Sequence, residues 1–351
     1  MKTSHIIDIA RKTIKRAAKK PAYTAPSVLR LDEALLARAT SEELGEVSVD
    51  TLLLYPRVLQ AVKAPGPRDY RDTLVIGVDS SSRQIDIPQE SIVVASVSVS
   101  SNSTPSLGDW PPLYGRALEG LEEPFIYVLP SSDDVDEPVE DYVTMSNPAG
   151  ARYDESYSVY QAMDEARVNL ENKALKALTG YVEEQARRRD VVVLIDGPLY
   201  LVTGALTSPG VRYEYRMAWE ALLKERIEAV KRLERAGAMV YGVVKRIDRA
   251  RLLSMNPAVD GRVRSCIGDS SYSDKLALYR ALARPPCTRY TGNGGGYALA
   301  SSLLAVSYNG LGIGKAVQYT VLPVPRWRPS PHASRYYRVE ESLEAWRSRG
   351  G

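Results

Sequence analysis

The sequence predicts an α/β protein in which antiparallel strands come first and helix-connected strands follow. Three short, almost wholly apolar runs, at 74–78, 191–195 and 239–244, are typical of strands covered on both faces. Stretches with helical apolar spacing, about 163–188 and 214–236, precede the second and third of these runs. Because each helix leads into a buried strand, the later strands are expected to be parallel and connected by helices.

The first apolar run is followed by segments that suit antiparallel partners. In 92–100 valine and alanine alternate with serine, as expected for a strand with one covered face, and 125–129 is a further strand. Late strands are expected at 316–322 and 336–339. This order predicts a ribonuclease H-like mixed sheet flanked by helices, with N-terminal helices and a C-terminal extension. A doubly wound nucleotide-binding fold is the main alternative, but the serine-alternating hairpin argues against it.

Three regions are expected along the chain. They are an N-terminal helical docking region, the ribonuclease H-like domain and a C-terminal tail, at residues 1–65, 66–340 and 341–351. The first begins with an amphipathic helix over 4–19, which has lysines and arginines opposite an apolar face formed by Ile6, Ile7, Ala10, Ile14 and Ala17. A second helix is expected around 31–38. Residues 101–155 are rich in Pro, Ser, Gly and Asp and are predicted to be a loop-rich insertion in the domain.

Composition narrows the kind of metal that the protein could bind. The cysteines are Cys266 and Cys287 and the histidines are His5 and His332, which leaves almost no room for a Cys/His zinc site. A metal would therefore be held mainly by carboxylates, which favours Mg²⁺ or Mn²⁺. The net charge of +3 neither requires nor excludes a polyanionic partner, because the placement of the charge matters more.

Nothing in the sequence suggests a membrane or secreted protein. No window approaches the roughly 18 apolar residues of a membrane span. The basic N-terminus lacks the apolar core of a secretory signal. A cytoplasmic protein is expected, in which the two cysteines are buried thiols more readily than a disulfide.

Two aspartates follow apolar runs and are the first candidates for catalysis. Asp79 follows the first run and Asp196 the second, so each is expected at the end of a buried strand. In a ribonuclease H-like sheet these strands are neighbours, and two converging carboxylates repel unless a divalent cation lies between them. Two such cations could activate a water and stabilise the leaving oxygen of a phosphodiester. The alternative is that either Asp only forms a turn, as Asp-Gly often does.

A third carboxylate is expected from the helix before the second buried strand. Glu171 lies next to the apolar stripe of this helix and is the first choice, with Glu165 in reserve. Lys245 follows the third apolar run and either contacts a phosphate or reaches into solvent. The glycine-rich segment 310–315 is not a phosphate loop, because Asn309 and Ala316 stand where that motif needs Gly and Ser or Thr.

The ordered set of motifs resembles the NurA nuclease family over about residues 70–342. The matching segments are Val78-Asp79-Ser80-Ser81-Ser82-Arg83, Arg167 to Glu171, Leu194-Ile195-Asp196-Gly197-Pro198-Leu199, Tyr241-Gly242-Val243-Val244-Lys245-Arg246, Ser273-Asp274-Lys275-Leu276 and Tyr337-Arg338-Val339-Glu340. Each segment is short, and their common order is much more specific than any one of them.

The resemblance implies several properties of the protein. They are a ribonuclease H-like fold, a toroidal homodimer and Mn²⁺-dependent cleavage of DNA, as a 5′-to-3′ exonuclease and single-strand endonuclease. The family acts with a HerA-type hexameric helicase/translocase in archaeal DNA end processing. Asp79, Glu171 and Asp196 would form the acidic cluster. His332 is the candidate for a late histidine of the family, and its tyrosine would be Tyr319, Tyr336 or Tyr337.

The leading hypothesis is a phosphodiesterase that binds one or two Mn²⁺ or Mg²⁺ ions through Asp79, Glu171 and Asp196. Lys245 would steady the phosphate, and His332 would act as a ligand or proton carrier. The substrates would be single- and double-stranded DNA ends. One alternative is a sugar kinase or actin-like ATPase, which shares the sheet and an early Asp. The other is a non-catalytic adaptor that docks a motor protein through its basic N-terminal helix.

Overall fold

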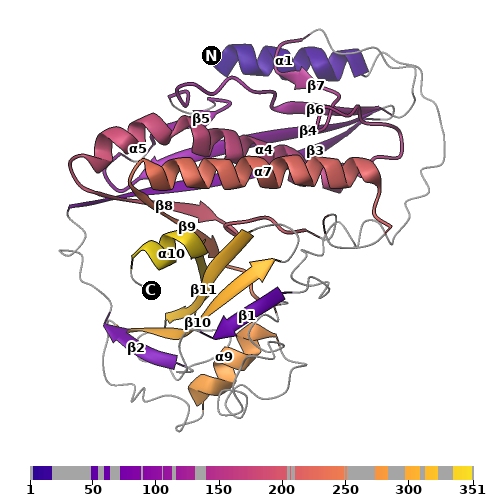
Figure 1. The fold of residues 1–351 in the computed structure, drawn as a ribbon. Coiled ribbons are helices and arrows are strands. Elements are labelled where there is room, and N and C mark those ends of the chain that lie inside the picture. Colours follow the sequence, from indigo (N-terminus) through magenta and orange to yellow (C-terminus); the bar gives the residue numbers. More distant parts are fainter. Residues whose placement is uncertain are drawn as a thin grey trace. The chain divides into compact units, whose positions relative to one another are not determined.

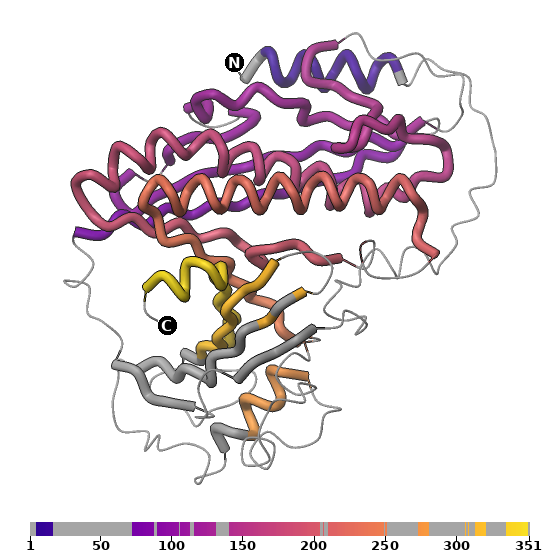
Figure 2. Tube along the Cα trace, in the orientation of Figure 1, coloured from indigo at the N-terminus to yellow at the C-terminus, as the bar shows by residue number. Residues whose placement is uncertain are grey.

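The structure, a computed structural model, forms two compact units. Unit 1 comprises residues 1–40, 74–193 and 201–238, and unit 2 comprises 41–73, 194–200 and 239–351. The structure describes residues 3–17, 49–53, 59–63, 72–87, 90–104, 106–112, 116–130, 140–203, 206, 210–248, 250, 273–283, 297–308, 313–322 and 335–349 (Figure 1). Figure 2 traces the backbone in the same orientation. The helix expected at 31–38 lies outside these residues.

Unit 1 is built on a mixed sheet (Figure 1). Its strands are β3 (Thr73–Ile87), β4 (Glu90–Ser101), β5 (Gly108–Trp110), β6 (Ile126–Pro130), β7 (Val143–Thr144) and the start of β8 (Asp190–Asp196). Their order is β8-β3-β4-β6-β7, with β5 beside β4. The pairs β3–β4 and β4–β6 are antiparallel, whereas β6–β7 is parallel. Three antiparallel strands with β8 beside the first give the predicted ribonuclease H-like arrangement.

Four helices of unit 1 are described, and one of them packs directly on the sheet. They are α1 (Thr3–Ala17), α4 (Val159–Ala177), α5 (Thr179–Ala186) and α7 (Tyr213–Arg235). Helix α4 packs on β4 and β6, and α7 lies against α4, where Val168 packs on Trp219 and Leu222 (Figure 1). The single helix predicted over 163–188 is two helices that meet at Leu178, before the weak helix formers Thr179 and Gly180.

Helix α1 buries a different face from the predicted one. Ile6, Ile9 and Thr13 are buried, whereas Ile7 and Ile14 are exposed. Positions 6, 9 and 13 follow the i, i+3, i+7 spacing of one helix face. The buried face of α1 therefore contains only some of the apolar residues of this helix. No helix among the described residues combines the length and apolar character needed to cross a membrane.

Unit 2 contains a second set of strands. They are β1 (Val49–Leu53), β2 (Leu59–Lys63), β9 (Ala238–Val244), β10 (Tyr297–Tyr308), β11 (Ile313–Leu322) and β12 (Arg335–Ser342), with helices α9 (Asp274–Ala283) and α10 (Leu343–Ser348). The order is β1-β10-β11-β12-β9, with β2 also on β10 and the end of β8 beside β9. The pairs from β1 to β9 are antiparallel. Helix α10 packs on β11 through Leu343 and Trp346.

A tight turn follows β8 in unit 2. The backbone N–H of Gly197 donates to the carbonyl oxygen of Val243 at 3.1 Å, so the turn lies directly on β9. Gly197 has φ +136°, a backbone conformation that residues other than glycine rarely adopt. A Cβ on Gly242 would overlap the backbone nitrogen of Leu199 and lie 2.9 Å from the carbonyl oxygen of Gly197. Glycine at 242 therefore allows the close approach of turn and strand.

Gly242→Ala is expected to lower the free energy of unfolding by about 1–3 kcal/mol, because the added methyl group forces the turn away from β9. Gly180→Ala is the matched control, since a Cβ at this helical position meets nothing within 4 Å. The control should be unchanged or slightly more stable. The free energy of unfolding of each variant is measured in urea, and equal stability of the two variants would contradict the proposed close packing.

Candidate active site

Asp79 lies in the middle of β3 rather than at its end. The predicted strand stops at Val78, but β3 continues to Ile87 in unbroken register with β4. What ends near Asp79 is the burial: Val78 is buried and Asp79 is exposed. The apolar run therefore marked the most buried part of the strand, and the serines that follow continue it as a hairpin with β4.

The face of β3 that carries Asp79 is polar. Asp79 pairs with Ser98 on β4, and Ser98 pairs in turn with Asp109 on β5. The Ser98 hydroxyl donates to Asp109 Oδ1 at 2.6 Å. Cross-strand partners share a face, so the side chains of Asp79, Ser98 and Asp109 form one acidic row. Sequence reasoning missed Asp109, because the residues around it are rich in Pro, Ser, Gly and Asp and show no clear strand pattern.

Glu171 is buried between α4, α7 and β3. Its Oε2 accepts a hydrogen bond of 2.6 Å from the Ser80 hydroxyl, and its Oε1 forms an ion pair with Arg226 of α7. The side chains of Glu171 and Arg226 are 3% and 0% exposed, so each requires the other's charge. Successive strand residues point to opposite faces, so Glu171 meets β3 on the face opposite Asp79.

Glu165, the reserve candidate, is fully buried. The Tyr157 hydroxyl lies 2.8 and 2.9 Å from its two carboxylate oxygens. Burial raises the pKa of Glu165 well above its ordinary value of 4.5, although the Tyr157 hydrogen bond opposes this. A carboxyl group that favours its neutral form is a poor ligand for a cation. The environment therefore favours a structural role for Glu165.

Asp196 and Lys245 form an ion pair in unit 2. Asp196 is the last residue of β8, as predicted, and Lys245 follows β9. Lys245 Nζ lies 2.7 Å from Asp196 Oδ2, with the two side chains 57% and 31% exposed. Both groups therefore remain accessible to a substrate. An ion pair this exposed contributes little to the free energy of unfolding. Its exposure therefore favours a chemical role over a stabilising one.

A buried charge cluster holds the turn that carries Asp196. Glu340 Oε2 accepts a hydrogen bond of 2.9 Å from the backbone N–H of Leu199. Its Oε1 lies 2.8 Å from both Lys315 Nζ and Arg338 Nε, and these three side chains are almost completely buried. Glu340 thus joins β11, β12 and the turn after β8. Sequence reasoning matched Glu340 as part of a motif but did not find this role.

Three tyrosines were candidates, and the structure separates them. The Tyr319 hydroxyl donates to the buried carboxylate of Asp274, the first residue of α9. Tyr336 and Tyr337 instead line a pocket of about 210 Å³ in unit 2, together with Ile247 and three cations. These cations are Lys245, Lys275 and Arg335. From the sequence, Lys275 was matched only as part of a motif and Arg335 was not singled out, because residues distant along the chain give no local pattern.

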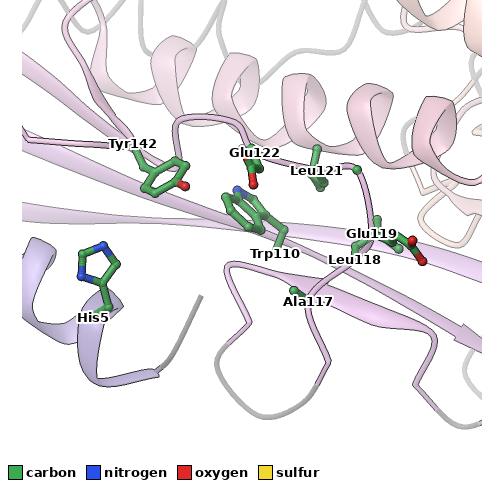
Figure 3. A pocket seen from close by; sticks show the side chains of 9 residues that line it. His5, Trp110, Ala117, Leu118, Glu119, Leu121, Glu122 and Tyr142 are labelled. Carbon is green, nitrogen blue, oxygen red and sulfur yellow. The ribbon is translucent and has the colours of Figure 1, made fainter.

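Unit 1 has a pocket of opposite character, of about 360 Å³ (Figure 3). Figure 3 shows His5, which comes from α1, with Trp110, Glu122 and Tyr142 across the pocket, and Glu119 also lines it. The Trp110 and Tyr142 rings meet edge-on, with centroids 5.4 Å apart. Two glutamates in the lining would repel a phosphate, so this pocket does not suit a polyanion.

The three carboxylates of the predicted acidic cluster do not all belong to one unit. Asp79 and Glu171 belong to unit 1, and Asp196 and Lys245 to unit 2. Among the residues that the structure describes, no three His, Cys, Asp or Glu side chains are arranged to hold a metal ion. His332, Cys266 and Cys287 lie outside the described residues.

A family model, that of the NurA domain, matches residues 73–349. The chain belongs to the NurA family. Membership makes this protein a nuclease, that is, a hydrolase of phosphodiester bonds, and confirms the predicted resemblance. No curated protein matches the chain significantly. Among solved structures, the crystal structure of the NurA nuclease from Sulfolobus solfataricus is similar at 11% identity and a TM-score of 0.40, covering 81% of this chain and 71% of that one.

Glu340→Gln should lower the free energy of unfolding by about 3–5 kcal/mol, because Lys315 and Arg338 would lose their buried counter-charge. Glu344→Gln on α10, whose side chain is exposed, is the control and should change stability by about 0.5 kcal/mol or less. Urea unfolding compares the two variants of this NurA protein. Equal stabilities would show that the Glu340 cluster does not hold the fold of unit 2.

Glu165→Gln should remove a pH dependence of stability. The pKa of Glu165 is raised on folding, so the folded protein keeps a proton that the unfolded chain loses. Its contribution to stability is therefore present below the ordinary pKa of 4.5 and decreases as pH rises towards the raised value. The variant should be relatively more stable at neutral pH, with a flatter profile in urea unfolding. Glu184→Gln, an exposed change on α5, should keep the wild-type profile.

Proposed function

We propose that this NurA-family protein is a metal-dependent DNA nuclease in which Asp196 and Lys245 act at the scissile phosphate. The observation that supports this proposal is their 2.7 Å ion pair beside a pocket lined by three cations. An exposed carboxylate next to a basic pocket combines a group for metal or proton chemistry with groups that attract the phosphate backbone. Family membership supplies the class of reaction.

Mn²⁺ or Mg²⁺ is the proposed metal, with Asp79 as a candidate ligand in unit 1 and Asp196 as a candidate ligand in unit 2. Glu171, the third carboxylate predicted from the sequence, meets β3 on the face opposite Asp79. Carboxylate oxygens are the donors that these hard cations prefer. Asp79 and Asp196 have the exposure that a ligand needs, whereas the carboxylate of Glu171 is engaged by Ser80 and Arg226. In this structure Glu171 is therefore the least suited of the three carboxylates to bind a cation. When bound, such a cation polarises the phosphodiester and lowers the pKa of a water molecule.

Lys245 has two roles in this proposal. Before DNA binds, its ammonium group neutralises the Asp196 carboxylate. When a phosphate arrives, the same group can turn to the phosphoryl oxygens, where negative charge increases during cleavage. His332 is proposed as the proton carrier for the leaving oxygen. Tyr336 and Tyr337 would contact the DNA strand next to Lys245, because they line the same pocket as this lysine.

The biological role is proposed from family membership. The protein would form a homodimer and process DNA ends in double-strand break repair with a HerA-type helicase/translocase, through 5′-to-3′ exonuclease and single-strand endonuclease activity. Size-exclusion chromatography of the chain alone, and with a HerA-type partner from the same source, tests the assembly. Elution as a monomer in both cases would contradict this part of the proposal.

Asp79→Asn and Asp196→Asn should each reduce cleavage of end-labelled single- and double-stranded DNA by about a hundredfold or more, because each removes a charged group at the reacting centre. Cleavage is measured with Mn²⁺, with Mg²⁺ and with EDTA, which should abolish it. Asp86→Asn on β3 and Asp190→Asn at the start of β8 are matched controls, since both residues are exposed at the far ends of the same strands. These variants should retain activity.

Retention of full Mn²⁺-dependent activity by both Asp79→Asn and Asp196→Asn would contradict the assignment of the site. Binding of DNA by the wild type without any cleavage would instead favour a non-catalytic adaptor. Hydrolysis of ATP in the absence of DNA would favour an ATPase built on the same sheet.

A further inference from the structure

The pocket in unit 2 has more positive charge than the Asp196–Lys245 pair needs. Lys245, Lys275 and Arg335 line it, and among the described lining residues none is acidic. Lys245 Nζ pairs with Asp196 at 2.7 Å and Lys275 Nζ with Asp248 at 2.6 Å. With both carboxylates counted, the residues that the structure describes at the pocket keep one positive charge in excess, that of Arg335.

The three cations come from three separate elements. Lys245 follows β9, Lys275 lies in the first turn of α9, and Arg335 is the first residue of β12. Such convergence of cations separated by up to about ninety residues favours a phosphate contact for Lys245 over the alternative that it only reaches into solvent. It gives the pocket donors on several sides, as recognition of a tetrahedral anion requires.

Buried contacts fix the element that carries Lys275. The Asp274 carboxylate accepts a hydrogen bond from Tyr319 of β11, and the backbone N–H of Asp274 donates to Ala250 at 2.7 Å. Ser273 caps the helix by accepting a hydrogen bond from the backbone N–H of Leu276. The first turn of α9 is therefore held in place, with its positive dipole end at Lys275.

We infer that this pocket binds a phosphate group of the DNA strand other than the one that is cleaved, an inference that rests on the proposed nuclease function. Lys275 and Arg335 would hold this phosphate while Lys245 and Asp196 act on its neighbour. The phosphate is either the terminal 5′-phosphate of a linear strand or an internal phosphodiester. Both have the same chemistry, and the test below separates them.

The test uses Lys275→Gln, Arg335→Gln and the double variant, with Arg347→Gln on α10 as a control for loss of a surface charge in the same unit. Binding is measured in EDTA, so that no cleavage occurs, by fluorescence anisotropy over a series of salt concentrations. The probes are a linear oligonucleotide with a 5′-phosphate, the same strand with a 5′-hydroxyl, and a circular single strand. Circular dichroism establishes that each variant is folded.

The double variant should bind the 5′-phosphorylated strand roughly tenfold more weakly than wild type. If this weakening is confined to that probe, the pocket holds the terminal phosphate. If all three probes weaken alike, and the slope of log affinity against log salt falls by about one per lost contact, it holds an internal phosphodiester. Unchanged affinity and slope for every probe would overturn the inference.

A second measurement separates this inference from the proposed function. Inorganic phosphate should raise the thermal midpoint of the wild type and of Arg347→Gln, but not that of the double variant, because a ligand of the folded state stabilises it. A wild type that binds phosphate in this way but does not cleave DNA would refute the nuclease proposal alone. A wild type that cleaves DNA, with a double variant that binds every probe normally, would refute the pocket alone.

Discussion

The pairing of buried charges is the constraint on which both units depend. Glu171 and Arg226 are buried together in unit 1, and Glu340 is buried with Lys315 and Arg338 in unit 2. A charge taken out of water without a partner costs several kcal/mol, so each of these groups fixes the position of the others. In unit 1 the pairing joins the two long helices to β3. In unit 2 it joins two strands to the turn after Asp196.

This constraint divides the acidic residues into two kinds. Those with buried partners, such as Glu171 and Glu340, hold elements together and have little freedom to exchange ligands. Asp79 and Asp196 instead remain accessible, and Asp196 is paired with a lysine whose side chain is exposed. A reaction at a phosphate needs accessible acidic residues, and acidic residues with buried partners can hold them in place. The Asp196 turn shows both, since a buried glutamate fixes the backbone that presents an exposed aspartate.

Electrostatics also distinguishes the two pockets. The pocket of unit 1 is lined by two glutamates, a histidine and aromatic rings, whereas that of unit 2 is lined by three cations and two tyrosines. The net charge of the chain is only +3, so composition alone does not reveal this difference. A polyanionic substrate is attracted by local charge, and the position of Lys275 and Arg335 beside Lys245 matters more than the total.

The sequence by itself determined the fold class, the family and the order of the main strands and helices. The fold class and the order of elements follow from short apolar runs and helical spacing, which are local properties of the chain. The family follows from the resemblance of an ordered set of short motifs. It also placed Asp196 and Lys245 at strand ends correctly. Only the tertiary structure decided that Asp79 is in mid-strand, that Glu171 is paired with Arg226, and which tyrosines face a pocket. Burial, strand register and ion pairing depend on residues distant in the chain, and local patterns do not contain them.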